Sequence, residues 1–124
     1  MSTLVAQTIS NGTVSTSSAN VIQGSAKTWV SFNGSSGASP TIRASYNVSS
    51  VTRTATGQYT VAFTNALPDA NYAAVFGTQD NPGGAQWAVA RNGGTYSTTA
   101  LQIQCWSYVG SGVDLPIVNV AIFD

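Results

Sequence analysis

The chain has 124 residues, of which four are basic and four acidic, so its net charge is zero, and it contains neither histidine nor glutamate. Neutrality excludes the clustered lysines and arginines that nucleic acids and acidic membrane surfaces require, and no apolar run is long enough for a membrane-spanning helix. The absence of histidine removes the usual catalytic triads.

The N-terminal part of the chain is mostly polar, with a few apolar side chains spaced along it. Residues 4–9 predict a short apolar strand or arm, and residues 10–20 predict a polar, flexible connector. We therefore divide the chain into an N-terminal arm, residues 1–25, and a β-domain, residues 26–124. Leu4, Val5 and Ile9 are the apolar anchors of the arm, and we expect them to contact a partner rather than the core of the domain.

The rest of the chain is rich in strand signals and lacks sustained helical periodicity. Short alternating segments recur at the spacing typical of sandwiches and barrels, and a slip in the alternation at Ser49 and Ser50 predicts a β-bulge. The sequence therefore predicts an all-β fold, a single antiparallel β-sandwich or jelly-roll-like domain with an extended N-terminal arm. The predicted strands cover residues 28–32, 42–48, 58–64, 72–76, 87–91, 101–106 and 115–123.

Two of these segments are apolar on both faces. Residues 72–76 predict a strand that is covered on both sides. In the last strand, Val118, Val120 and Ile122 occupy one face, whereas Ile117, Ala121 and Phe123 occupy the other. Either this strand is central and lies under a loop, or part of its cover comes from another subunit. We take Val118, Val120 and Ile122 as the candidate subunit interface.

Few residues offer chemistry. Asp80 and Asp114 lie in predicted loops and could form the carboxylate pair of a glycosidase, but Asp80 begins a turn sequence in which aspartate bonds its own backbone. Cys105 cannot form an internal disulfide because it is the only cysteine, and its mid-strand position predicts a small buried hydrophobic side chain. The sequence predicts no enzyme activity, no metal site and no cofactor.

Aromatic side chains are the remaining candidates for recognition. Trp87, Trp106 and Tyr108 flank the predicted loops 80–86 and 107–114. They form either a platform for a sugar ring or, as is more common in β-domains, anchors of the core or of an interface. A neutral chain can recognise a ligand only through aromatic faces and uncharged hydrogen-bonding groups, and loops are the usual place for such contacts.

Three stretches resemble a module of tailed-bacteriophage virions. They are GSAKTWVSFNG (24–34), TIRASYNVSSVTRTATGQYTVAFTNALPDANYAAV (41–75) and VNVAIFD (118–124), whereas residues 77–116 are less similar. The module forms the C-terminal part of tail fibres and also occurs as short virion proteins. The resemblance implies a structural role, often as a homotrimer, and carries over no catalytic residues.

The resemblance leaves two positions in the virion open. About 25 residues before the domain cannot supply a long fibre shaft. We expect a trimeric head decoration or cement protein whose arm lies on the major capsid protein, because a polar arm such as residues 10–20 stays ordered more easily when another surface holds it. The alternative is a short tail fibre or fibre tip that is bound to another tail protein and binds a receptor or glycan on the host surface.

Overall fold

The computed structural model describes residues 2–79 and 84–124. It confirms the all-β prediction, with two packed antiparallel sheets and one short helix. Asp80, which was considered as a catalytic carboxylate or as a turn residue, lies outside the described residues. The elements in chain order are β1 (Thr8–Ser10), β2 (Ser15–Ser17), α1 (Ser18–Gly24), β3 (Thr28–Asn33), β4 (Thr41–Tyr46), β5 (Val48–Ala55), β6 (Gln58–Phe63), β7 (Ala73–Thr78), β8 (Gln86–Ala90), β9 (Ala100–Ser107) and β10 (Val118–Phe123).

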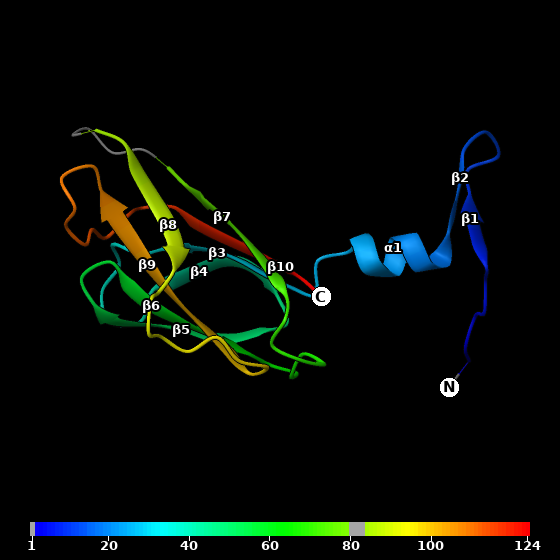
Figure 1. Ribbon diagram of the computed structural model, residues 1–124, viewed down its shortest axis with the longest axis horizontal. Coiled ribbons are helices and arrows are strands. Elements are labelled where there is room, and N and C mark those ends of the chain that lie inside the picture. The colour runs from blue at the N-terminus through cyan, green and yellow to red at the C-terminus, as the bar shows by residue number, and fades with distance from the viewer. Residues whose placement is uncertain (1, 80–83) are drawn as a thin grey trace.

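The domain is a sandwich of two four-stranded sheets (Figure 1). The first sheet has the order β4-β3-β10-β7 and the second the order β5-β6-β9-β8, with every pair antiparallel. Alternate residues of each strand point inward, and the core between the sheets is apolar because these positions carry aliphatic and aromatic side chains. At its centre the rings of Phe32 and Tyr59 meet edge to face, with centroids 5.1 Å apart.

The chain crosses between the sheets at Asn47, a position with a positive φ of 57°. Asparagine tolerates this conformation better than most residues. Its side-chain amide nitrogen donates to Thr28 Oγ1 at 3.0 Å and to the Asn65 carbonyl at 3.1 Å, while its oxygen accepts from the Asn65 N–H at 2.8 Å. The crossing is thereby tied to both neighbouring strands. Directly after it, the register of β5 shifts between Val48 and Ser50, which confirms the predicted bulge.

The last strand corrects the predicted subunit interface. β10 pairs with β3 on one side and β7 on the other, so it is central in its sheet. Val118, Val120 and Ile122 point inward and are buried in the core of the same chain. These three side chains are therefore not available to a second subunit, and the surface that remains open is the opposite face of the strand.

Two further expectations were wrong. Residues 72–76 were predicted to be covered on both sides, but β7 is an edge strand whose Val75 is 56% exposed. The connector predicted for residues 10–20 instead contains β2 and the start of helix α1, which was not predicted. The helix begins after Ser17, whose hydroxyl oxygen accepts a hydrogen bond from the Asn20 N–H, the usual arrangement of an N-cap.

Candidate functional site

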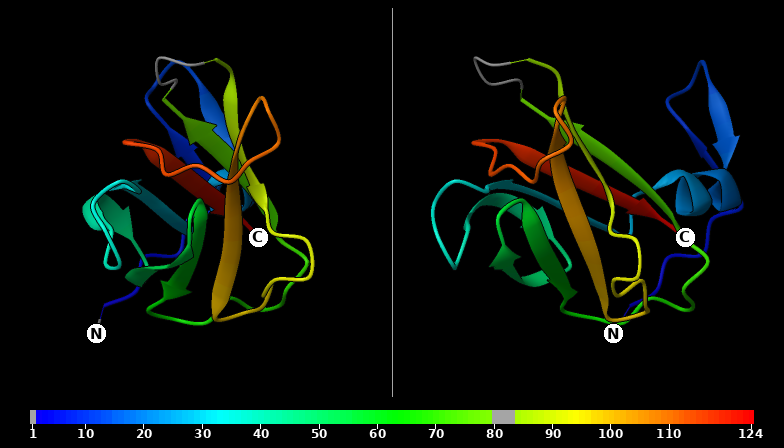
Figure 2. Two further views of the ribbon diagram at one scale, coloured as in Figure 1. Left: turned by 90° about the vertical axis from the view of Figure 1, so that its left-hand side faces the viewer. Right: turned by 60° about the vertical axis from the view of Figure 1, so that its left-hand side comes forward.

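The N-terminal arm stands away from the sandwich in Figure 1, and the right-hand view of Figure 2 again shows its hairpin to one side of the sheets. It consists of the β1–β2 hairpin and helix α1, and it joins the domain shortly before β3. Leu4 and Val5 are 91% and 87% exposed, and Ile9 is also exposed. The helix buries none of its residues. The predicted anchors are therefore open to a partner, and none of them belongs to the core.

The arm also forms an apolar hollow of its own. Leu4, Val5 and Ile9 line a cavity of about 450 Å³ together with Val21 and Ile22 of the helix. No residue from 2 to 26 carries a charged side chain. A two-stranded hairpin and a helix of seven residues are each marginally stable in isolation. We therefore expect the arm to be stably folded only where another protein surface covers this hollow.

The outer face of the second sheet holds two of the three predicted recognition residues. Trp87 on β8 and Trp106 on β9 are direct partners in the strand register and point away from the core. Directly opposite residues on one face of a sheet lie close enough for their side chains to touch. Trp87 is 43% exposed and Trp106 is half-buried. The interpretation of these two indoles as core residues is therefore wrong.

Tyr108, the third predicted residue, lies in the loop beyond β9 and is 62% exposed. Its ring covers Gly84, where an added Cβ would come within 2.5 Å of Tyr108 Cδ1. Tyr108 therefore packs against Gly84. Its side chain does not line the groove that Trp106 forms with Gln58 and Gln104 on the outer face of the sheet. The structure thus brings two of the three aromatics together and leaves the third apart.

The outer face of the first sheet carries a second apolar hollow. Gly77 and Ala121, the smallest residues of its lining, leave the space, Trp29 and Val75 also line it, and its volume is about 460 Å³. Trp29 is the register partner of Ala121, and Val75 is the partner of Ala121 on the other side. This row of uncharged side chains is the exposed apolar face that the sequence had placed on Val118, Val120 and Ile122.

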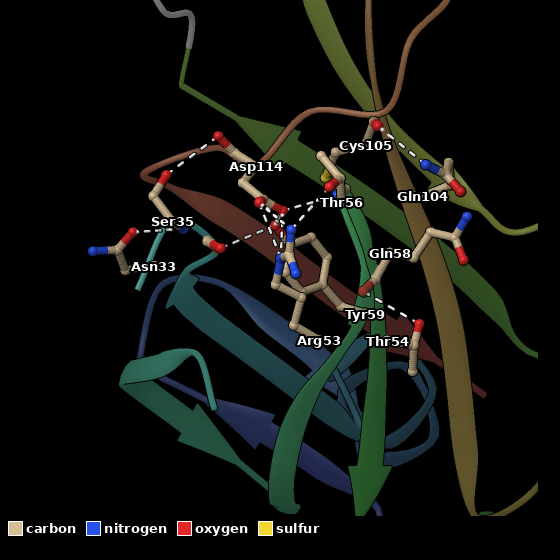
Figure 3. A network of polar contacts seen from close by, with 12 residues as sticks. Asn33, Ser35, Arg53, Thr54, Thr56, Gln58, Tyr59, Gln104, Cys105 and Asp114 are labelled. Carbon is tan, nitrogen blue, oxygen red and sulfur yellow. Dashed lines mark hydrogen bonds and ion pairs between the residues drawn. The ribbon is translucent and has the colours of Figure 1, made fainter. Parts of the chain in front are cut away.

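A polar network at one end of the sandwich was missed by the sequence analysis (Figure 3). The carboxylate of Asp114 accepts hydrogen bonds from Arg53 Nε at 3.0 Å and Nη2 at 2.8 Å, from the Gly57 N–H at 2.8 Å and from the Tyr59 hydroxyl at 2.6 Å. Gly57 has φ of 71°, and an added Cβ there would approach the Cys105 carbonyl within 2.6 Å. The network pins the loop before β10 to the β5–β6 hairpin.

Burial and the hydrogen bonds of this network shift the pKa values of its members. Burial raises the pKa of Asp114, but the hydrogen bonds from Arg53, Tyr59 and Gly57 outweigh burial, so the pKa is lowered overall. Burial and the hydrogen bond to Asp114 raise the pKa of the Tyr59 hydroxyl, so this group stays protonated. The ionised carboxylate accepts from Arg53, Gly57 and Tyr59 at once, and so links three parts of the chain.

Cys105 lies beside this network, where its backbone N–H donates to the Gly57 carbonyl at 2.7 Å. The thiol is fully buried in the core, which confirms the prediction of a small buried side chain, and burial raises its pKa to about 12. Within residues 2–79 and 84–124, no three acidic, cysteine or histidine side chains come together as metal ligands would.

Comparison with known proteins gives no family for this chain. No protein-family model matches it, and no curated protein and no solved structure shows significant similarity to it. None of the helices in the described part of the chain is long and apolar enough to cross a membrane.

Proposed function

We propose that this chain is a non-enzymatic structural protein of a bacteriophage virion and that its N-terminal arm attaches it to another virion protein. The observation that carries the proposal is the arm itself, in which exposed apolar side chains line an uncharged hollow outside the folded domain. Exposed apolar surface of this kind marks a site of protein–protein contact. The assignment to a virion comes from the resemblance of residues 24–34, 41–75 and 118–124 to the phage module.

Within the virion, we place the chain on the head as a decoration or cement protein. An arm that reaches beyond a rigid sandwich is suited to lie on the lattice of the major capsid protein and hold the domain above it. A short tail fibre or fibre tip is the second candidate. It is favoured by the exposed pair Trp87 and Trp106, because a fibre tip needs an outward recognition face and a cement protein does not.

The proposal includes a homotrimer. The outer face of the first sheet, with Trp29 and Val75 around the hollow at Ala121, is the subunit contact we now put forward in place of the buried side chains of β10. Its side chains are uncharged, so burying them against a second copy leaves no charge unpaired. Light scattering of the purified chain should give three times the mass of the 12.7 kDa monomer.

Attachment by the arm can be tested with particles that lack the protein. Purified full-length chain should bind such particles, whereas a variant with Leu4→Asp and Val5→Asp should lose binding because it places charges in the apolar contact. Thr13→Asp, in the polar turn of the same arm, is the matched control and should bind normally. Equal binding by the double variant would show that the arm is not the attachment element.

A further inference from the structure

The outer face of the sheet β5-β6-β9-β8 places an indole ring next to two amides. Gln104 on β9 has Gln58 as its register partner on β6 and Val89 as its partner on β8. Trp106 lies two residues further along the same face of β9. Together these side chains line a groove of about 310 Å³, a size that suits a single small ligand.

The amide of Gln104 is short of hydrogen-bond partners. The residue is only 5% exposed, although it points to the outer face of the sheet. Its Nε2 donates to the Cys105 carbonyl at 3.4 Å, which is long for a hydrogen bond, and its Oε1 accepts from none of the described residues. Among the described residues the fully buried side-chain atom without a partner is Gln86 Oε1, so Gln104 Oε1 is reachable from the groove rather than sealed in the core. An amide oxygen that borders a groove without a partner is therefore a site where a ligand hydroxyl can donate.

The other residues that line the groove favour an uncharged ligand. Arg91 and Asn92 also line the groove, and no carboxylate contributes. Arg91 Nη1 already donates to Gln102 Oε1 at 3.3 Å, so its guanidinium is partly held within the sheet. Indole faces pair with the C–H faces of sugar rings, and amides pair with hydroxyls as both donor and acceptor.

We propose that this groove binds one pyranose ring of a neutral glycan, with the ring stacked on Trp106 and its hydroxyls bonded to the amides of Gln58 and Gln104. Trp87, beside Trp106 on the next strand, extends the aromatic surface toward a second sugar. The proposal goes beyond the structural role and does not depend on it, because the groove belongs to the isolated domain. One stacked ring and two amides give weak binding, with a Kd of about 1 mM.

The three tryptophans allow a direct test by nuclear magnetic resonance. Each indole N–H gives its own signal in a ¹⁵N–¹H spectrum, and single Trp→Phe variants assign the signals to Trp29, Trp87 and Trp106. Cellotetraose, maltotetraose and chitotetraose are added to the full-length chain at about 10 mM, roughly ten times the expected Kd. At least one should shift the Trp106 signal, whereas Trp29, on the opposite sheet, should not move.

Variants separate the groove from non-specific stacking. Gln58→Ala and Trp106→Ala should each weaken binding of the active tetrasaccharide about tenfold. Trp29→Phe should leave it unchanged. Trp106 is half-buried, so Trp106→Ala could unfold the domain. In that case the Gln58→Ala variant alone tests the groove. The proposal is overturned if no neutral tetrasaccharide moves the Trp106 signal, if Trp29 moves equally, or if only tetragalacturonate, the acidic control, binds. Any of these outcomes leaves attachment by the arm untouched.

Discussion

Replacing Asp114 by alanine tests the network that fixes the loop before β10. In the variant the Gly57 N–H, which is buried, loses its acceptor, and an unsatisfied buried donor costs about 1–3 kcal/mol. The Tyr59 hydroxyl loses its bond at 2.6 Å but keeps the Gly34 carbonyl within 3.1 Å, so its loss is smaller, about 1 kcal/mol. Arg53 is open to water and can be rehydrated, so it adds nothing to the sum.

The expected loss in the free energy of unfolding is therefore about 2–4 kcal/mol. Urea unfolding followed by tryptophan fluorescence measures it. In a domain of this size such a loss lowers the melting temperature by about 10–25 °C. Asp124→Ala is the matched control, because it removes an exposed carboxylate and should change stability by no more than about 0.5 kcal/mol.

A loss below about 1 kcal/mol for Asp114→Ala would refute this reasoning, because it would mean that water replaces the carboxylate at no cost. A double-mutant cycle with Tyr59→Phe isolates the short hydrogen bond. The two substitutions should be less than additive, since either one alone removes the same contact. Full additivity would show that the hydroxyl and the carboxylate act independently.

Four further outcomes follow from the structure. Because the folded-state pKa of Asp114 is lowered, the stability it contributes is present above about pH 4 and is lost as the pH falls through the folded-state pKa, so in acid titrations Asp114→Asn should converge with the parent chain at low pH. Val120→Asp should prevent folding, as judged by circular dichroism, because it buries an unpaired charge in the core. Gly57→Ala should lower the melting temperature, because it combines a φ of 71° with a backbone clash. Val75→Asp should leave the monomer folded and reduce the mass found by light scattering, and an unchanged trimer would remove the outer face of the first sheet as the subunit contact.

Alternation along single strands was enough to predict the sandwich. Leu101, Ile103 and Cys105 were expected on one face of a strand, and all three are fully buried in the core. When both faces of a strand are apolar, alternation does not show which face points into the core. The face of β10 that is buried was therefore predicted to be an interface. That choice depends on the order β3-β10-β7, which brings together strands far apart in the chain.

Predicting the candidate sites requires contacts between residues that are far apart in the sequence, more than predicting the fold does. Arg53 and Asp114 are 61 residues apart, and nothing local to either residue marks them as partners. The sequence named Trp87 and Trp106 as candidates for recognition or for the core, but their direct pairing follows from the register of β8 and β9. Helix α1 was missed because its seven residues are too few to show a helical stripe.

The central claim is that this chain is a structural part of a virion, and a copy count by quantitative mass spectrometry of purified, salt-washed phage particles tests it most directly. The head-decoration assignment predicts copies on the order of hundreds per particle, set by the symmetry of the capsid lattice. A count of a few multiples of three or six would move the protein to the tail. Its absence from intact particles would contradict the claim.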